Sequence, residues 1–273
     1  MKVGFIGLGS MGLPMAQRIR AEGHDLALYA RRQASLEPFA GADGVTFAAT
    51  PAELGAAVDA VGVCVFDAAG VEEVLFGTDG LAGAMEPGSV VLVHSTLSPA
   101  QIRSIAERAT TYGLRVLDAP VSGGSARALA GELTIMVGGE AGALADVSEL
   151  LAALSGHVVH LGGVGAGSYA KLVNNALFTA QIVLADDAMR AGESLGVDPA
   201  ALADILTTGS SACVASGIRL RAGSLAGIAG TAADAALTKD VTLMAELLGD
   251  APGSELVDVA RRFVTAMREA GSR

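Results

Sequence analysis

The 273-residue chain has no tryptophan, few other aromatic residues and only two cysteines. Half of its residues are hydrophobic, so the core must be built mainly from Ala, Val, Leu and Ile. Cys64 and Cys213 are too few for a disulfide framework or a cysteine-rich metal site. The four histidines are not grouped with carboxylates or cysteines at ligand spacing, and we therefore predict no metal.

Positive charge is also scarce, because 18 Lys and Arg stand against 29 Asp and Glu, which gives a net charge of −11. Binding nucleic acid requires clustered basic side chains, so this balance argues against a general nucleic-acid partner. Long uncharged apolar runs are lacking as well. The longest helical stretch, residues 165–196, carries a lysine, two asparagines and two aspartates and is not a membrane span. We predict a cytoplasmic protein without a membrane partner.

Glycine, in contrast, is abundant, and three glycines form a spaced motif near the N-terminus. An apolar strand at 3–6 precedes G-x-G-x-x-G, and residues 13–22 have the pattern of a helix. In that context the glycines permit a tight turn, the approach of a pyrophosphate and close helix packing. The alternative is a plain turn between strand and helix. We predict that a dinucleotide binds this turn, at Gly7, Leu8, Gly9, Ser10, Met11 and Gly12.

The end of the second expected strand, residues 26–29, indicates which dinucleotide is preferred. A site for NAD usually has Asp or Glu there to hold the ribose hydroxyls. Here the chain continues Ala30-Arg31-Arg32 without a carboxylate. Two guanidinium groups can pair with a 2′-phosphate, so NADP(H) is favoured over NAD(H). The alternative is that the arginines are merely solvated at a helix start.

Strands and helices alternate in the first part of the chain, which predicts a doubly wound, mainly parallel α/β sheet. After residue 196 we find only helical patterns and no convincing strand. The glycine-rich segment 161–167 marks the junction, giving domains at 1–162 and 163–273. Further strands are expected at 61–66, 90–94, 115–119, 133–137 and 158–161, and helices at 99–112, 141–154, 165–196, 199–207, 212–221, 233–248 and 254–270.

The long helix 165–196 carries polar residues that packing alone does not explain. Lys171 and Asn175 are four residues apart and lie on one face, about one turn from each other. Ser168 is expected to cap the start of the helix. Ligands of doubly wound sheets lie at the carboxyl ends of strands, where Ser122 and the backbone N–H groups of Gly123 and Gly124 can converge on a carboxylate. An ordinary turn is the alternative for that segment.

Six motifs follow one another along the chain: GFIGLGSMGLPMA, STLSP, DAPVSGG, GELTIMVGG, GAGSYAKLVNN and TKD. In these motifs, which occur in the same order as in the family, the chain resembles the β-hydroxyacid dehydrogenase family, which is related to 6-phosphogluconate dehydrogenase. The resemblance covers nearly the whole chain. It implies an N-terminal Rossmann domain and an all-helical domain joined by a long helix. It also implies a homodimer or homotetramer and a small carboxylated substrate.

The same resemblance implies roles for individual residues. Lys171 matches the catalytic lysine, and Asn175 matches the residue that holds the substrate beside it. The segment Ser122, Gly123 and Gly124 matches the loop that binds the substrate carboxylate. Positions matching cofactor contacts are Val65, Phe66, Thr96 and Lys239, with Phe66 standing where relatives often have proline.

The expected reaction is hydride transfer between NADP(H) and a small 3-hydroxy acid or its semialdehyde. Lys171 would give or take the proton at the substrate oxygen. Two alternatives stay open. An imine reductase of the same superfamily would generally lack this lysine, and a non-catalytic NADP(H) sensor would not need the DAPVSGG segment.

Overall fold

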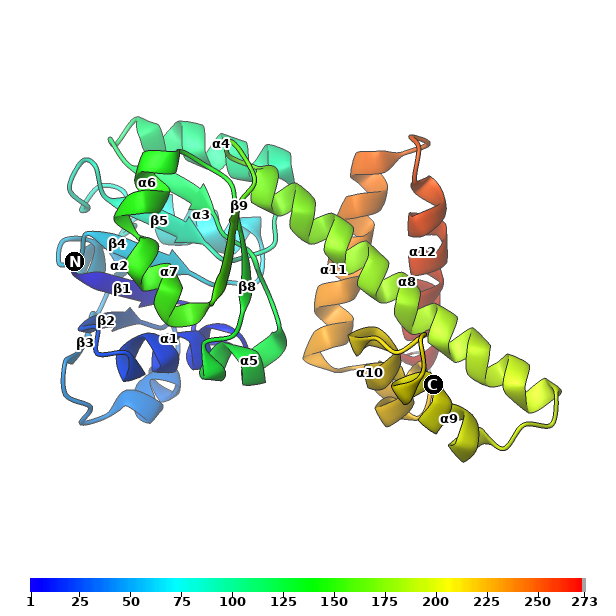
Figure 1. The fold of residues 1–273 in the computed structure, drawn as a ribbon. Coiled ribbons are helices and arrows are strands. Elements are labelled where there is room, and N and C mark those ends of the chain that lie inside the picture. The colour runs from blue at the N-terminus through cyan, green and yellow to red at the C-terminus, as the bar shows by residue number, and fades with distance from the viewer. Residues whose placement is uncertain (272–273) are drawn as a thin grey trace. The chain divides into compact units, whose positions relative to one another are not determined.

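The computed structural model describes residues 1–271. The chain divides into two compact units, with the boundary between Lys171 and Leu172. The first unit contains all nine strands of the described chain, and the second is helical (Figure 1). Helix α8 (Ala166–Ser194) runs through the boundary as one element of 29 residues. An α/β domain followed by a helical region is therefore confirmed, with the long helix shared by both.

The first unit is built on a six-stranded sheet in the order β3-β2-β1-β4-β5-β6, in which every pairing is parallel. This order reverses direction on either side of β1, as expected for a doubly wound dinucleotide-binding fold. The strands are β1 (Val3–Ile6), β2 (Leu26–Tyr29), β3 (Val45–Phe47), β4 (Ala60–Val63), β5 (Val90–Val93) and β6 (Arg115–Asp118).

Alternate residues of the central strands enter different hydrophobic clusters, one on each face of the sheet. Phe5 joins the cluster that contains Met15 and Ile19 of α1, whereas Ile6 joins the cluster that contains Ile102 and Ile105 of α4. Both faces are covered by helices, and the strands are consequently apolar throughout. The α-helices of the first unit before α8 are α1 (Gly12–Ala21), α2 (Pro51–Gly55), α3 (Ala68–Phe76), α4 (Pro99–Thr110), α5 (Gly124–Ala130), α6 (Ala141–Asp146) and α7 (Ser148–Leu154).

A second, three-stranded sheet completes the first unit. Its strands are β7 (Val121–Ser122), β8 (Thr134–Val137) and β9 (His157–His160), with β7 antiparallel and β9 parallel to β8. The short strands β3 and β7 have too few residues to give a recognisable alternation in the sequence. The predicted helix 141–154 is two helices, because the buried Val147 takes φ −106° and ψ 11° and interrupts it.

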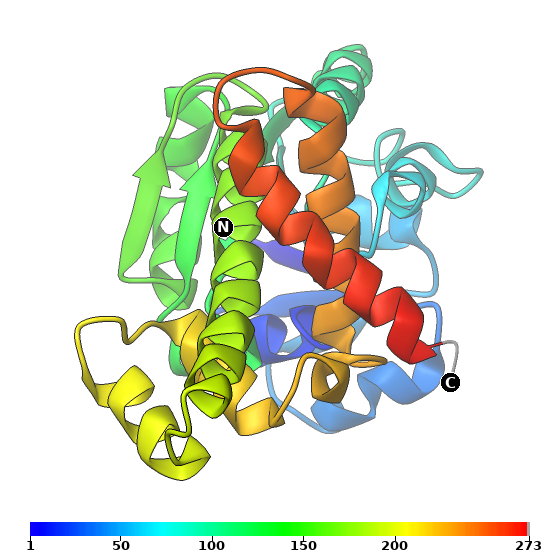
Figure 2. The same ribbon diagram turned by 90° about the vertical axis from the view of Figure 1, so that its right-hand side faces the viewer.

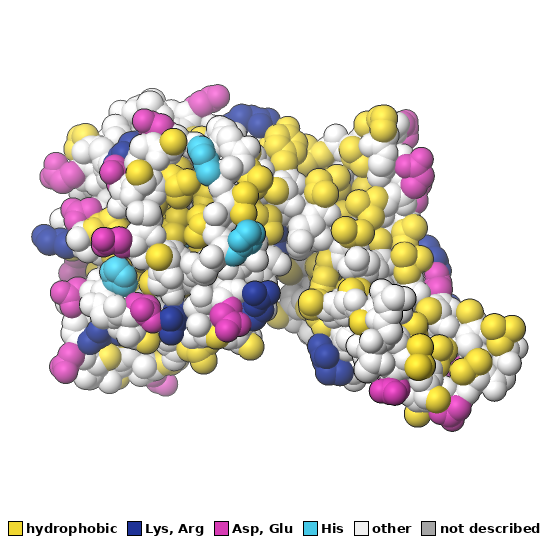
Figure 3. Space-filling model, in the orientation of Figure 1, with side chains coloured by type: hydrophobic (Ala, Val, Ile, Leu, Met, Phe, Trp, Pro, Cys, Tyr) yellow, Lys and Arg dark blue, Asp and Glu magenta, His cyan; other side chains and the backbone are white. Residues whose placement is uncertain are grey.

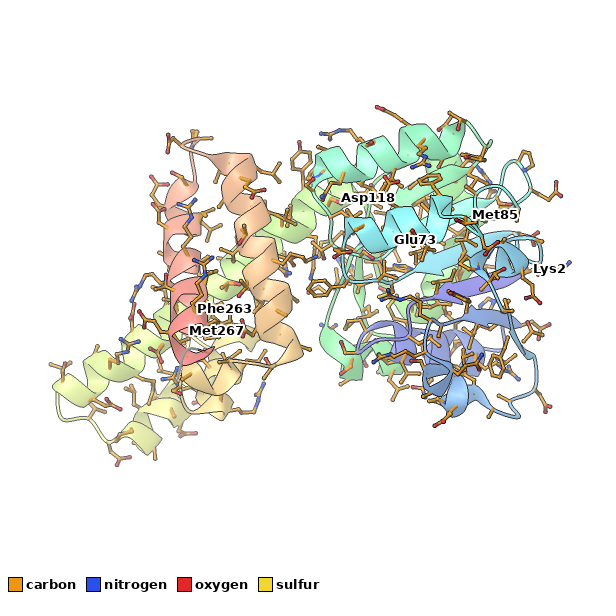
Figure 4. All side chains as sticks on the ribbon, turned by 180° about the vertical axis from the view of Figure 1, so that it is seen from behind. Lys2, Glu73, Met85, Asp118, Phe263 and Met267 are labelled. Carbon is orange, nitrogen blue, oxygen red and sulfur yellow. The ribbon has the colours of Figure 1, made fainter. Side chains whose placement is uncertain are left out.

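The second unit packs four helices with the rest of α8: α9 (Pro199–Thr208), α10 (Val214–Ala222), α11 (Ala232–Leu248) and α12 (Ser254–Gly271). Helices α11 and α12 lie side by side (Figure 2). Phe263 and Met267 of α12, labelled in Figure 4, are buried together with Ile182 and Val183 of α8. No helix among residues 1–271 is both long and apolar enough to cross a membrane.

Candidate active site

The glycine-rich turn after β1 is shaped by two close backbone approaches and one open position. Gly7 has φ 97°, and a Cβ on it would collide with the carbonyl of Cys64. A Cβ on Gly12 would collide with the carbonyl oxygen of Gly7. Gly9, in contrast, has no protein atom within 4 Å of the position a Cβ would take. The backbone at Gly9 therefore faces open space, which a pyrophosphate can approach.

The start of helix α1 has the chemistry of an anion site. No side chain caps it, and its first turn contains no acidic residue. Its first N–H groups carry the positive end of the helix dipole toward the turn. Residues 7–12 therefore fit a dinucleotide, whose phosphates they would hold at the helix N-terminus.

The two arginines after β2 are both exposed. Arg32 has an extended backbone, with φ −106° and ψ 115°, and directly precedes a 3₁₀ helix at Gln33–Phe39. Neither guanidinium has a carboxylate next to it in the sequence, because residues 29–33 contain no acid. The structure thus places two exposed cations where the ribose of a bound dinucleotide ends in this fold.

The loop after β4 is held by a side chain from the end of β5. Ser95 Oγ accepts a hydrogen bond from Val65 N (3.0 Å) and donates one to Val65 O (2.7 Å). Because a side chain uses both backbone groups of Val65, the strand ends at Val63 and not at residue 66 as predicted. The next residue, Phe66, is exposed, and Thr96 after Ser95 is half-buried.

The DAPVSGG segment leaves the sheet at the end of β6. Ser122 is half-buried at the end of β7, and Gly123 and Gly124 are exposed. These two glycines have φ values of 139° and 76°, a conformation that side chains disfavour. Helix α5 begins at Gly124 without a side-chain cap. The exposed backbone of this turn is compatible with the predicted carboxylate contact.

Asp118, the first residue of that segment, determines where helix α8 begins. Its Oδ1 accepts a hydrogen bond from Gly165 N (2.8 Å), and its Oδ2 accepts one from Ser168 N (2.7 Å). The predicted cap by Ser168 is therefore wrong, because α8 starts two residues earlier and the acceptor comes from β6. Ser168 Oγ is buried and has no hydrogen-bond partner among the described residues. Lys171 follows one turn later and is half-buried.

In the helical unit, a buried aspartate connects two of the predicted site residues. Asn175 Nδ2 donates to Asp240 Oδ2 (2.6 Å), and Asp240 Oδ1 lies 3.4 Å from Lys239 Nζ. Asn174 Nδ2 donates to Asn175 Oδ1 (3.1 Å). Asp240 thereby fixes the orientation of the Asn175 amide and neutralises part of the charge of Lys239.

His94, next to Ser95 and Thr96, is a buried structural residue. Its ring stacks on Phe5, and Nδ1 lies 2.8 Å from the carbonyl oxygen of Ala119. A carbonyl can only accept, so Nδ1 carries the proton and donates. Burial lowers the pKa of His94 to about 4, although the hydrogen bond to Ala119 opposes the shift. The ring is consequently neutral at physiological pH.

The first unit gathers most of the predicted site at one edge of its sheet. The residues of the glycine turn, Arg31, Arg32, Val65, Phe66 and Thr96 follow β1, β2, β4 and β5, and parallel strands end at the same edge. Asn175 and Lys239 belong to the second unit. Sequence reasoning placed Ser95 and Asp118 in segments at strand ends and Asp240 in a Lys-Asp pair, but it assigned none of the three a role in the site. The sequence signal that could have indicated Asp118 is a carboxylate at the end of an apolar strand, because a buried charge needs a dedicated partner.

Comparison with known protein families shows which family has this combination of domains. The profile of the NAD binding domain of 6-phosphogluconate dehydrogenase matches residues 2–162. The profile described as the NAD-binding domain of NADP-dependent 3-hydroxyisobutyrate dehydrogenase matches residues 165–273. The chain belongs to the β-hydroxyacid dehydrogenase family. It is an NAD(P)-dependent hydroxyacid dehydrogenase.

Three relatives illustrate the range of this dehydrogenase family. L-Threonate dehydrogenase of Cupriavidus necator is 43% identical over 206 residues, which are 75% of this chain and 69% of the relative. A crystal structure of 3-hydroxyisobutyrate dehydrogenase from Salmonella typhimurium is 30% identical with a TM-score of 0.87, covering 98% of this chain and 95% of its own. The structure of Psf3 in complex with NADP⁺ and 2-OPP is 25% identical with a TM-score of 0.86, and the match covers 98% of this chain and 94% of the Psf3 chain.

Proposed function

We propose that this dehydrogenase prefers NADP(H) and interconverts a small 3-hydroxy acid, of the 3-hydroxyisobutyrate type, with its semialdehyde. The observation that carries the cofactor preference is the pair of exposed arginines directly after β2, with no carboxylate between Tyr29 and Gln33. Guanidinium groups pair with a phosphate, whereas an NAD site needs an acceptor for ribose hydroxyls. The NADP⁺ complex of the related Psf3 supports this choice.

The substrate class is supported by the segment at the end of β7. Ser122 offers a hydroxyl, and the Gly123 and Gly124 amides are exposed, which suits a carboxylate. The two named relatives, L-threonate dehydrogenase and 3-hydroxyisobutyrate dehydrogenase, both carry names of small hydroxy acids. In our proposal Ser122 and the glycine amides hold the carboxylate end of the substrate.

The nicotinamide, when bound, supplies or accepts the hydride. Lys171 donates a proton to the carbonyl oxygen in the reductive direction and removes it in the oxidative direction. Asn175, whose amide is oriented by Asp240, donates to or accepts from the substrate one helical turn away from Lys171. Val65, Phe66, Thr96 and Lys239 contact the cofactor in this proposal.

Initial rates test the proposal with NADP⁺ and NAD⁺ against 3-hydroxyisobutyrate, L-threonate and their homologues, and with NADPH against short semialdehydes. We expect Lys171→Met to lower kcat about 10²- to 10⁴-fold, as for the loss of a general acid–base. Arg31→Ala with Arg32→Ala should reduce the preference for NADP⁺ by about 10- to 100-fold, the value of one charged hydrogen bond. Arg268→Ala, which removes an exposed arginine of α12, is the control.

Each alternative predicts a different result. Binding of NADPH with no turnover of any carboxylated substrate would favour a sensor over an enzyme. Turnover of cyclic imines that survives Lys171→Met would favour an imine reductase. Equal kcat/KM for both cofactors in the wild-type chain would overturn the role given to the two arginines.

A further inference from the structure

We propose that Asp118 is a positioning residue for the reaction, because it fixes Lys171 relative to the Ser122–Gly124 turn. The inference rests on the proposed function and concerns residues of the first unit only. Asp118 is 1% exposed and ends β6, and the turn begins four residues later. Its side chain is the structural connection between the turn and the start of helix α8, and it is labelled in Figure 4.

The backbone of Asp118 is fixed from two sides. Asp118 N donates to Gly138 O (3.0 Å), and Gly138 N donates to Asp118 O (2.8 Å), so the residue is paired with the end of β8. The carboxylate then accepts one N–H at each oxygen from the beginning of α8. A carboxylate that holds two amides in this way has little freedom to move.

The helix start approaches this carboxylate closely because two glycines leave room. A Cβ on Gly138 would collide with Asp118 Oδ1, and one on Gly167 would lie 2.9 Å from Asp118 O and 3.0 Å from Oδ2. The sequence thus provides both the acceptor and the space around it. This favours a dedicated clamp on the first turn of α8 over a chance contact.

Lys171 lies three residues beyond Ser168, about 4.5 Å along the helix axis, within the same stiff element. A shift of the first turn is therefore transmitted to the lysine. Proton transfer requires heavy atoms at hydrogen-bond distance, and a displacement of about 1 Å at a reacting centre costs about 100-fold in rate. Asp118 consequently acts through Lys171 and makes no contact with substrate in this proposal.

The test is a double-mutant cycle between Asp118→Asn and Lys171→Met, measured as kcat and as NADPH dissociation constant. Asparagine keeps the size and one acceptor but loses the second acceptor and the charge. We expect kcat to fall about 30- to 100-fold with NADPH affinity changed by less than about threefold. In the Lys171→Met background, Asp118→Asn should have little further effect, because both changes remove the same step.

Matched variants keep the result interpretable. Asp198→Asn alters another cap, in which Asp198 Oδ1 accepts from Ala201 N (2.8 Å) on helix α9, and should retain wild-type kcat. Ser168→Pro, at the third residue of α8, removes one donor from the opposite side of the clamp, because proline has no N–H. It should lower kcat in the same direction even if Asp118→Asn does not fold.

The outcomes separate this inference from the proposed function. If the wild type turns over the substrate and Lys171→Met abolishes turnover, but Asp118→Asn and Ser168→Pro both keep normal kcat, the positioning role is overturned and the function stands. Additive losses in the double variant would also overturn it, since they would show a general structural effect. A wild type without turnover would refute the proposed function itself.

Discussion

At the scale of single residues, three buried polar side chains beside the candidate site each have defined hydrogen-bond partners. His94 donates to Ala119, Ser95 bonds both backbone groups of Val65, and Asp118 accepts two amides. His94 and Ser95 directly follow β5, and Asp118 is the last residue of β6, so all three lie next to predicted site segments. Buried polar groups are costly when unpaired, so these side chains can hold the loops in one conformation.

His94 gives a testable dependence of stability on pH. Burial holds the pKa of the folded state at about 4, against an ordinary value of 6.5. As the pH falls below 6.5, the unfolded chain binds a proton that the folded chain does not, so stability is lost progressively down to about pH 4. The free energy of unfolding should fall by about 2 kcal/mol from about pH 7.5 to about pH 5 through this residue.

Urea unfolding of the wild type, His94→Asn and His157→Asn at these two pH values measures the effect. Asparagine at 94 keeps a donor for Ala119 but does not titrate, so this variant should lose most of the pH dependence. His157 is exposed, and its variant should behave as the wild type. An unchanged pH dependence in His94→Asn would show that other groups cause it.

At the scale of elements, helices and strands were predictable where a local sequence pattern specifies them. They were not predictable where a tertiary contact determines the position at which an element begins or ends. The strands 3–6 and 26–29 and the starts of α4, α9 and α12 follow from apolar spacing and from Ser98, Asp198 and proline signals. The ends of β4 and α8 depend on Ser95 and Asp118, which lie 30 and 50 residues away in the chain. The residues next to these element ends in the sequence do not indicate which distant side chain will bind there.

The candidate site was predictable to a similar degree. The glycine turn, the arginines and Lys171 stand out because their chemistry is visible in their residue types and spacing. The supporting residues are common types in ordinary positions: a serine and an aspartate at strand ends, and Asp240 in a Lys-Asp pair resembling solvated surface. Only the structure reveals that Asp240 is buried and bonded to Asn175.

Two glycines of the glycine turn, Gly9 and Gly12, should respond differently to substitution by alanine. Gly9→Ala should fold normally, because its Cβ would meet open space, but the added methyl group would occupy the approach of the pyrophosphate. We expect the NADPH dissociation constant to rise by on the order of tenfold or more. Gly12→Ala should instead destabilise the fold by about 1–3 kcal/mol, since its Cβ meets Gly7 O.

Isothermal titration with NADPH and thermal unfolding of both variants distinguish the two effects. Gly41→Ala is not a suitable control because Gly41 has φ 73°. Gly83 has neither a positive φ nor a neighbour within 4 Å of its Cβ position, so Gly83→Ala should match the wild type in both measurements. If Gly9→Ala binds NADPH normally, the turn does not hold the phosphates in the proposed manner.

At the scale of the whole molecule, the helical unit exposes a surface with several large apolar side chains. Val173, Leu177 and Leu184 recur at spacings of four and seven residues and therefore lie on one face of α8. Hydrophobic side chains gather over this unit in Figure 3. None of the ten residues of α9 is buried, and Ile205 on it is exposed. A helix this short is marginal without packing.

We infer that a second copy of the chain covers this surface, and that the protein is a dimer or tetramer. The chain has a mass of 27.1 kDa, so sedimentation equilibrium separates these states from a monomer.

Leu184→Glu should shift the population toward monomer, because it places a charge within an apolar contact. Leu129→Glu is the matched control: both leucines are 53% exposed on a helix, but Leu129 lies on α5 of the first unit. A monomeric wild type, or equal effects of the two variants, would contradict self-association through α8. A shift confined to Leu184→Glu would instead identify α8 as part of the contact between subunits, since the two substitutions differ only in their place in the fold.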